Sequence, residues 1–354
     1  MTTVHQVLSS AGPYDAVSVQ ARLWRQLLTA QGHGGADYAA SVDPRARGDF
    51  QPLQRLPAEG ADLLIIRYSA HSAALMRVLE RPEPKLVVYH NVTPPGYFWN
   101  HHVGVALACA VGRAQLPRFA RAATVAAGDS EFNAAELRAA GAADARVLPI
   151  LFDPQRLEPR GTPPAGEGPM VLVVSRLAPN KRHDLAIAAF AAWRAEHGVD
   201  ARLVCVGEPV SPSYGELIAG LAASVDGGAV TLAGGLDQPD LNAAYAAADV
   251  VFSMSEHEGF SVPLLEAFHF GVPVVARPAG AMPEVGGDAV LWDRADDLAV
   301  TAELLQRAVC DPQLRQSLAE RGRARLAEYE HARTAERIAG AVEDALSQGS
   351  EDLR

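Results

Sequence analysis

Residues 255–273 read Ser-Glu-His-Glu-Gly-Phe-Ser-Val-Pro-Leu-Leu-Glu-Ala-Phe-His-Phe-Gly-Val-Pro. The preceding residues 248–254 are mostly apolar and include two adjacent valines, which is typical of a buried parallel strand. A helix is expected next, because Ser261 can cap it and Pro263 suits its first turn. The stretch therefore predicts a strand, a glycine-marked turn and a helix, from which doubly wound α/β sheets are built.

The turn predicts an anion site. The amides of Phe260, Ser261 and Val262 would lie unpaired at the start of the helix. Glu258 stays on the turn, whereas Glu266, about one helical turn further in, can reach a neutral polyol such as ribose. Since a carboxylate beside an anion site is costly unless it binds hydroxyls, a sugar nucleotide fits both features. The alternative is that both glutamates are solvated acids at a helix start.

A second block, residues 171–190, places two cations after another predicted strand. Arg176 follows the apolar run 171–174, and Lys181 precedes an amphipathic helix. The carboxyl ends of parallel strands are where open α/β sheets bind ligands. Cations there would stabilise the negative charge of a departing nucleoside diphosphate. The alternative is that both are surface cations without partners.

Together these blocks resemble the retaining glycosyltransferases of the GT-B fold, family 4 (group 1). Residues 258–266 are similar to the family's E-x7-E signature, and residues 271–276 and 279–285 continue its pattern. The block at 171–190 is similar to the family's strand, Arg/Lys loop and helix. The resemblance is firm over the C-terminal half of the chain and loose over the N-terminal half.

The resemblance implies two Rossmann-like doubly wound domains that face each other across a cleft and close over the substrates. The second domain would bind the nucleoside-diphosphate sugar. The implied donor contacts are Arg176, Lys181, Gly207, Gly234, Leu236, Glu258, Gly259, Phe260, Ser261 and Glu266. The implied catalytic group is His90, Glu258, Arg176 and Lys181. Within it, the two cations would hold the diphosphate and Glu258 the sugar, while Glu266 would bind the ribose.

In the first half of the chain, His90 follows the predicted strand 86–89, a position that opens onto a ligand site in such sheets. The resemblance implies that it contacts the transferred sugar. A neutral imidazole can donate a hydrogen bond to a sugar hydroxyl without adding a nucleophile. The alternative is a histidine held by the local turn.

The loop after the first predicted strand departs from the family. Many relatives carry two glycines there, whereas this chain has Gly12 alone. Gly12, Tyr14 and Asp15 are the predicted acceptor-binding residues. Asp15 binds an acceptor hydroxyl or caps the following helix, and the sequence leaves both open.

Length and composition predict the domain plan. The chain has 354 residues, of which 49% are hydrophobic, enough for two cores. We expect a first domain over 1–155, a linker over 156–168, a second domain over 169–330, and a helix over 331–354 that packs back on the first domain. The three cysteines lie far apart in apolar contexts, which favours buried free thiols. The chain contains no Asp-x-Asp sequence, so no metal is expected and cationic side chains take its place.

Charge is unequal between the two halves. Residues 1–150 carry 14 Lys/Arg and 12 Asp/Glu, which leaves 31 − 14 = 17 and 42 − 12 = 30 for the remainder. The sequence contains no basic stripe with interleaved aromatic residues, so a nucleic-acid partner is not expected. The start of the chain lacks the features of a signal peptide, so the protein is expected in the cytoplasm. The helical stretch 103–125, with three arginines, is an ordinary amphipathic helix or a peripheral contact at the inner face of the membrane.

The sequence therefore predicts a retaining hexosyltransferase. It would move mannose, glucose or an N-acetylhexosamine from a UDP- or GDP-sugar to a sugar or glycolipid acceptor, in bacterial surface polysaccharide or glycolipid synthesis. The alternatives are a tailoring glycosyltransferase for a small glycoside, a GT-B sugar-nucleotide epimerase, and a non-catalytic sugar-nucleotide sensor.

Overall fold

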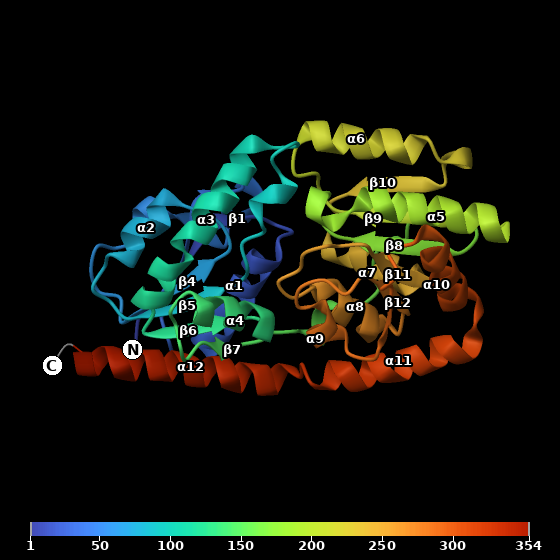
Figure 1. The fold of residues 1–354 in the computed structure, drawn as a ribbon. Helices are drawn as coiled ribbons and strands as arrows, with labels where there is room; N and C mark the ends of the chain where they lie inside the picture. Colours follow the sequence, from blue (N-terminus) through green and yellow to red (C-terminus); the bar gives the residue numbers. More distant parts are fainter. Residues whose placement is uncertain (1, 353–354) are drawn as a thin grey trace. The chain divides into compact units, whose positions relative to one another are not determined.

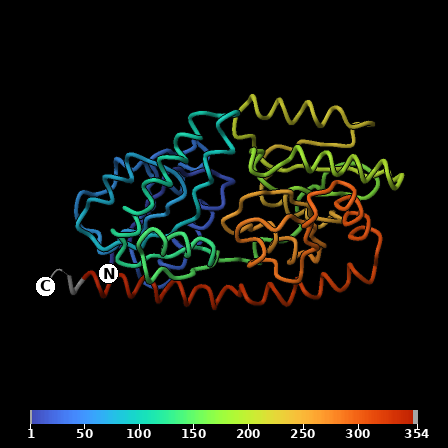
Figure 2. The backbone as a smooth tube through the Cα atoms, in the orientation of Figure 1, coloured from blue at the N-terminus to red at the C-terminus, as the bar shows by residue number. Residues whose placement is uncertain are grey.

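A computed structural model describes residues 2–352. The chain divides into two compact units, which are drawn in Figure 1 and traced in Figure 2. The first unit comprises residues 1–96, 103–152 and 329–354, and the second comprises residues 97–102 and 153–328.

The first unit is built on a seven-stranded parallel sheet in the order β3-β2-β1-β4-β5-β6-β7. Its strands are β1 (Val4–Ala11), β2 (Asp37–Val42), β3 (Phe50–Pro52), β4 (Leu63–Tyr68), β5 (Lys85–Tyr89), β6 (Val125–Gly128) and β7 (Arg146–Val147). Its helices are α1 (Ala16–Ala30), α2 (Ala73–Leu79), α3 (Val103–Ala122), α4 (Glu131–Ala139) and α12 (His331–Asp352). The order reverses direction between β1 and β4, which is the switch point of a doubly wound sheet.

The last helix, α12, completes the core of the first unit. Its buried residues Ile338, Ala341, Val342 and Ala345 repeat at helical spacing on one face. They join the core cluster that contains Leu63 and Leu86 from the sheet. In Figure 2 the red end of the trace accordingly runs along the part of the chain drawn in blue and teal.

The second unit has a six-stranded parallel sheet in the order β10-β9-β8-β11-β12-β13. Its strands are β8 (Met170–Val174), β9 (Arg202–Val206), β10 (Val230–Gly234), β11 (Val250–Ser253), β12 (Val274–Ala276) and β13 (Val290–Trp292). Its helices are α5 (His183–His197), α6 (Pro212–Ala223), α7 (Gln238–Ala247), α8 (Val262–Phe270), α9 (Met282–Gly286), α10 (Leu298–Cys310) and α11 (Pro312–Ala327). Here the strand order reverses between β8 and β11.

Apolar strands fix the register of this second sheet. β8 and β11 pair through Val171 with Val250, and their buried side chains join a core with Phe190 and Trp193 of α5. The residues 157–169 that lead into β8 form no regular helix or strand.

The cysteines differ in part from the expectation of buried thiols. All three are free, but only Cys205 is buried, while Cys109 is half-buried and Cys310 is exposed. Cys310 is the last residue of α10, where the apolar sequence context reflects the buried face of the helix and not the position of the thiol.

Candidate functional site

The carboxyl ends of β8 and β11 bring two predicted site residues together. Lys181 ends the short helix η5 (Pro179–Lys181) after β8, and Glu258 lies in the loop after β11. Lys181 Nζ lies 2.6 Å from Glu258 Oε2, and the side chains are 19% and 12% exposed, respectively. The ion pair therefore sits at the switch point of the second sheet, where such folds bind ligands.

Arg176 lies in the same loop after β8 and differs from Lys181 in its surroundings. Its side chain is exposed and has no ion-pair partner among the residues that the structure describes. An exposed guanidinium can engage a phosphate through two parallel hydrogen bonds without first breaking an internal contact.

The loop that carries Glu258 is held from two sides. On one side, the Asn180 carbonyl accepts from the Glu256 amide at 2.9 Å, and the buried Asn180 side chain donates to the His257 carbonyl at 3.3 Å. On the other side, the Ala281 amide donates to the Glu258 carbonyl at 3.0 Å. Asn180 has no feature in the sequence that marks it, because its partners are distant along the chain.

Gly280 allows this close approach. Its φ is +54°, and a Cβ atom there would lie 2.1 Å from the Glu258 carbonyl oxygen. Any larger residue would therefore displace the backbone of Glu258.

The start of α8 corrects one prediction. Ser261 has φ 83°, in the left-handed region, and its side chain caps no amide of the helix. Pro263 occupies the first turn, as the sequence predicts. The left-handed backbone aims the Ser261 side chain differently from the extended conformation that a capping serine adopts. The amides of Phe260, Ser261 and Val262 remain predicted contacts of an anion.

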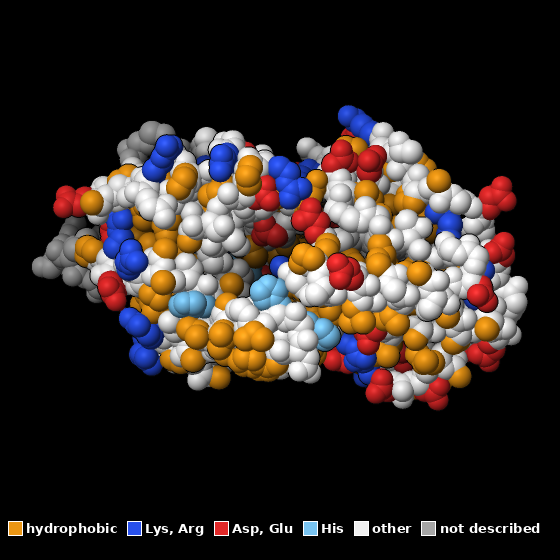
Figure 3. Space-filling model, turned by 90° about the horizontal axis from the view of Figure 1, so that it is seen from above, with side chains coloured by type: hydrophobic (Ala, Val, Ile, Leu, Met, Phe, Trp, Pro, Cys, Tyr) orange, Lys and Arg blue, Asp and Glu red, His pale blue; other side chains and the backbone are white. Residues whose placement is uncertain are grey.

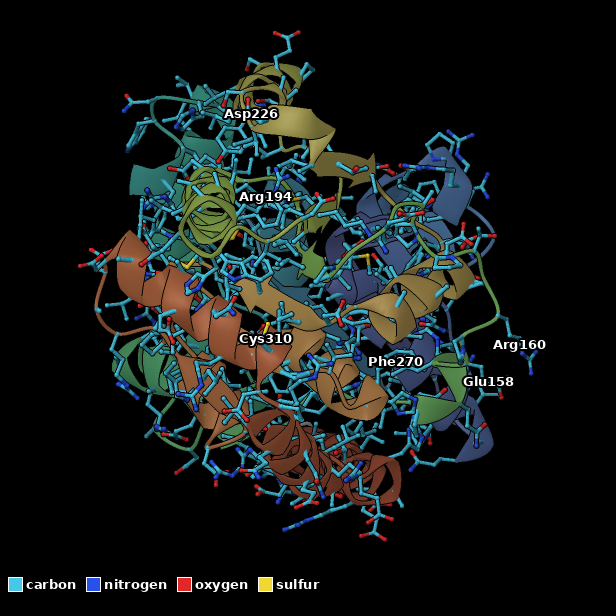
Figure 4. All side chains as sticks on the ribbon, turned by 90° about the vertical axis from the view of Figure 1, so that its right-hand side faces the viewer. Glu158, Arg160, Arg194, Asp226, Phe270 and Cys310 are labelled. Atoms are coloured by element: carbon cyan, nitrogen blue, oxygen red, sulfur yellow. The ribbon has the colours of Figure 1, made fainter. Side chains whose placement is uncertain are left out.

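Glu266 on α8 is held by a residue that the sequence did not indicate. The Tyr245 hydroxyl donates to Glu266 Oε2 at 2.7 Å. Burial raises the pKa of Glu266, while the hydrogen bond from Tyr245 and the charge of Arg156 oppose that rise. Tyr245 is itself buried and stacks on Phe270, with ring centroids 5.6 Å apart; Phe270 is labelled in Figure 4. The Tyr245 hydroxyl, held in place by this stacking, therefore fixes one carboxylate oxygen of Glu266.

The remaining predicted donor contacts end two neighbouring strands of the same sheet. Gly207 follows β9 with φ +148°, and a Cβ there would lie 2.1 Å from the Ser175 carbonyl oxygen. The Gly207 amide donates to the carbonyl of Gly234, the last residue of β10, at 2.8 Å. Leu236 follows in the next loop and is half-buried. These loops share the carboxyl edge of the sheet with Arg176.

In the first unit, His90 follows β5 and is enclosed. Its side chain is 5% exposed. Its Nδ1 lies 3.0 Å from Asp129 Oδ2, and its Nε2 lies 3.3 Å from Arg67 Nη1. Both ring nitrogens thus have partners within the first unit. Neither Asp129 nor Arg67 was among the predicted site residues.

The loop after His90 is fixed by a polar cluster. Asn91 adopts φ 73° and donates to Asn133 Oδ1 at 2.7 Å and to Glu136 Oε2 at 3.1 Å. Arg113 donates to Glu136 Oε1 at 2.8 Å and to the Val92 carbonyl at 2.7 Å. The turn that His90 opens is therefore tied to α3 and α4.

The loop after β1 carries Asp15, whose contact with an acceptor hydroxyl stays a prediction. Asp15 Oδ1 accepts from the Ser18 amide at 2.9 Å, and Oδ2 accepts from the Gly12 amide at 3.0 Å. Asp15 is therefore the N-cap of α1. Tyr14 is exposed, and the Arg45 guanidinium lies 5.3 Å from its ring centroid.

Residues 155–325 match the family model Glycosyl transferases group 1. This region is similar to the group 1 glycosyltransferases. It contains every donor contact predicted above, from Arg176 to Glu266.

Curated relatives match about half of the chain. The MMP α-(1→4)-mannosyltransferase of Mycolicibacterium hassiacum is 35% identical over 190 residues, which are 51% of this chain and 44% of that protein. The D-inositol 3-phosphate glycosyltransferase of Acidothermus cellulolyticus is 33% identical over 51% of this chain and 42% of that protein. A GDP-mannose-dependent monoacylated α-(1-6)-phosphatidylinositol monomannoside mannosyltransferase of Corynebacterium glutamicum is 33% identical over 44% and 42%. The matched regions span less than half the length of these relatives.

Solved structures match along nearly the whole chain. Anabaena HepE in complex with UDP and glucose has a TM-score of 0.75 at 16% identity, covering 97% of this chain and all of that one. Sucrose-phosphate synthase from Thermosynechococcus elongatus has a TM-score of 0.77 at 17% identity, covering 98% and 100%. At these identities the likeness establishes the fold. The prediction of a GT-B protein with two Rossmann-like doubly wound domains is confirmed.

Proposed function

We propose that this protein is a retaining hexosyltransferase that uses a nucleoside-diphosphate sugar. The observation that carries the proposal is the group at the β8/β11 switch point, where exposed Arg176 shares a loop with Lys181, and Lys181 pairs with Glu258 from the loop after β11. Two cations and a carboxylate match a ligand that combines a diphosphate with sugar hydroxyls.

Each side chain then has a separate role in the reaction. Arg176 and Lys181 bind the diphosphate and stabilise the charge that it gains as the glycosidic bond breaks. Glu258 accepts hydrogen bonds from sugar hydroxyls, and Glu266 accepts them from the ribose. His90 contacts the transferred sugar. The acceptor oxygen bonds to the anomeric carbon on the face that the diphosphate leaves, and a leaving phosphate oxygen takes the acceptor proton.

We further propose that transfer needs no metal ion, because cationic side chains supply the charge that a bridging ion would otherwise provide. Turnover should therefore persist after dialysis against EDTA. Loss of turnover that returns with Mg²⁺ or Mn²⁺ would contradict this part of the proposal.

The first donor to test is GDP-mannose. Five of the seven curated relatives have names that specify mannosyl transfer or dependence on GDP-mannose. UDP-glucose is the second donor, because HepE has been solved with UDP and glucose. Retention would be measured directly by comparing the anomeric NMR coupling constants of donor and product.

The first experiment is a thermal-stability panel of UDP-, GDP-, ADP- and dTDP-sugars. A ligand that binds only the folded state raises the melting temperature by mass action. A shift with one nucleotide that is lost in Glu266→Gln would support the donor site. If no sugar nucleotide shifts the melting temperature, with or without candidate acceptors, the donor site is refuted.

Product analysis separates the alternatives. An epimerase converts its sugar nucleotide without an acceptor, whereas a sensor binds it without turnover. A tailoring enzyme glycosylates a small glycoside and leaves glycolipids unchanged. Incubating the preferred donor alone, and then with each acceptor class, distinguishes these outcomes.

We also propose a peripheral membrane contact through α3. Val103, Leu107 and Val111 lie one helical turn apart and are 56%, 52% and 38% exposed. Arg118 and Arg121 are exposed further along the same helix. Figure 3 shows hydrophobic and basic side chains on the surface of the first unit that is seen from above. An apolar stripe followed by cations suits an anionic bilayer. Leu116 and Phe119, in contrast, face the core.

The membrane proposal is tested by flotation with anionic liposomes. Leu107→Gln combined with Val111→Gln should reduce flotation, whereas Leu217→Gln, which changes an exposed leucine of α6, should not. Equal flotation of all three proteins would contradict the contact. No helix among residues 2–352 has the length and apolar character needed to cross a bilayer.

A further inference from the structure

Arg67 is a buried cation in the middle of the first unit. Its side chain is fully inaccessible, and its guanidinium lies 4.4 Å from the Trp24 ring centroid. Nε and Nη2 donate to Gln6 Oε1 at 2.9 and 2.8 Å. Burial lowers the pKa of Arg67 to about 9, so the guanidinium remains charged at neutral pH. No carboxylate among the described residues forms an ion pair with it.

Burying this cation costs free energy that an apolar residue would avoid. An apolar side chain of similar volume would pack against Trp24 without a desolvation penalty. The structure directs one guanidinium nitrogen, Nη1, at His90 Nε2, 3.3 Å away. This contact gives Arg67 a role that packing alone does not supply.

The chemistry of the two partners decides the state of the His90 ring. Arginine has donors and no acceptor, so His90 Nε2 must accept and carries no proton. On the other side of the ring, Nδ1 lies 3.0 Å from Asp129 Oδ2. A carboxylate accepts, so Nδ1 carries the proton. Both contacts are satisfied by one neutral tautomer and by no other protonation state.

The two partners are themselves fixed. The Asn133 side chain donates to Asp129 Oδ1, and the Asn133 amide donates to Ser130 Oγ at 3.1 Å. The His90 amide donates to the Tyr68 carbonyl at 2.9 Å, so the backbone of His90 is part of the sheet edge. Each ring nitrogen therefore contacts a group whose orientation is fixed by other hydrogen bonds, Arg67 by Gln6 and Asp129 by Asn133.

We propose that Arg67 and Asp129 are positioning residues that hold His90 as a neutral imidazole protonated on Nδ1. A substrate hydroxyl that reaches Nε2 then meets a lone pair and donates to it, in exchange for the Arg67 contact. This polarity is the opposite of the donation that the sequence suggested. The contact between His90 Nε2 and a substrate hydroxyl rests on the proposed function, whereas the assignment of the His90 tautomer does not.

The tautomer can be observed without any assay of activity. Two-bond ¹H–¹⁵N NMR correlations of histidine ring protons distinguish Nδ1–H, Nε2–H and doubly protonated rings. His90→Gln identifies the His90 signals among the 11 histidines of the chain. We expect the Nδ1–H pattern in the wild-type protein. An Nε2–H or doubly protonated pattern at neutral pH would overturn the proposal.

Arg67→Met tests which residue imposes this state. Without the donor at Nε2, the ring should lose its exclusive Nδ1–H pattern, and Arg67→Lys should restore part of it. If the Arg67→Met spectrum keeps the wild-type pattern, Arg67 does not position His90. If Arg67→Met fails to fold, the wild-type and Arg67→Lys spectra still decide the question.

Lys85→Met is the matched control. Lys85 is a buried cation at the start of β5, the strand that His90 follows, and it donates to the Arg81 and Glu83 carbonyls. Its removal should destabilise the fold without changing the His90 spectrum. If Lys85→Met alters the spectrum as Arg67→Met does, the effect is one of stability and the proposal fails.

Kinetics add a second readout once a donor is known. Arg67→Met should lower kcat by about 10- to 100-fold while the donor KM changes less than about 3-fold, because the residue acts through His90 and not on the diphosphate. Lys85→Met should change both constants less than about 3-fold. Equal losses in both variants would overturn the positioning role. If the wild-type protein turns over no donor, the proposed function fails, and the NMR result still decides the tautomer.

Discussion

The two sheets share the same strand order over six strands but differ in the burial of the charged side chains at their carboxyl edges. In the second unit, the side chains of Arg176, Lys181 and Glu258 remain in contact with solvent. In the first unit, Arg67 and Asp129 are buried and already occupy both nitrogens of His90. The charged side chains at the second edge can exchange their internal contacts for contacts with a ligand. The side chains around His90 at the first edge are already fixed by buried internal contacts. We therefore expect substitutions at the two edges to fail in different ways.

The largest expected effect comes from Lys181→Met. It should lower kcat/KM by about 10²- to 10³-fold, because it removes a charge that stabilises the leaving diphosphate. The melting temperature should change little, since partly exposed ion pairs contribute at most about 1 kcal/mol. Arg67→Met should show the reverse balance, because it leaves the buried Gln6 Oε1 and His90 Nε2 without their donor, and this loss should outweigh the desolvation cost that is avoided. Similar stability losses in denaturant titrations of both variants would break the comparison between the edges.

A smaller effect is expected from Gly280→Ala. The added Cβ would force the Glu258 backbone to move, which should lower kcat/KM by about 10- to 100-fold. Gly220 of α6 is the control, because nothing lies within 4 Å of a Cβ there and its φ is ordinary. Gly220→Ala should leave activity unchanged and raise the melting temperature slightly. Unchanged activity in Gly280→Ala would show that the second edge does not depend on this loop.

Glu258→Gln should separate binding from turnover. Removing the carboxylate frees Lys181 from its ion pair, so a free nucleoside diphosphate should bind about 3- to 10-fold more tightly. Turnover should fall, because the sugar loses a charged acceptor. Isothermal titration with the nucleotide alone measures the first effect. Weaker nucleotide binding would mean that the ion pair does not compete with the ligand.

The smallest expected effect is on stability, from Glu266→Gln. The pKa of Glu266 is raised in the folded state by burial, so its ionisation opposes folding at pH values above that raised pKa. Glutamine removes this cost and can still accept from Tyr245. The melting temperature should therefore rise by about 1 to 3 °C at pH 8, and the rise should vanish below about pH 4.5, where both states are protonated. A larger rise in acid than at pH 8 would contradict the assigned sign.

Local pattern predicted most of the fold. The apolar runs at β5, β8 and β11 each predict a strand, and the alternation of strands with helices indicates doubly wound sheets. The strands β2, β3 and β7 were not predicted. Only Tyr38 and Val42 of β2 have strong strand propensity, and β3 and β7 are only three and two residues long. Such strands are defined by their neighbours in the sheet more than by their own sequence.

The site was predictable where its residues belong to one local motif. Lys181 and Glu258 came from separate motifs, and the sheet order brings them together. Asn180 and Tyr245 act through partners that are distant in sequence or on another helix, so no spacing rule marks them. Arg67 is the clearest case, because an arginine in an apolar strand gives no sign of what its guanidinium contacts. The cap predicted for Ser261 was wrong because the turn imposes a left-handed backbone there.

The place of α12 has a consequence for biosynthesis. The apolar face formed by Leu63 and Leu86 is covered by Ile338 and Val342, which the ribosome adds much later. At about 5 to 20 residues per second, the intervening residues 153–330 take roughly 10 to 35 s to translate. During that time the apolar face of the first unit that α12 will cover is exposed, and such a surface can bind chaperones. The domain that begins translation first is therefore the last to be finished.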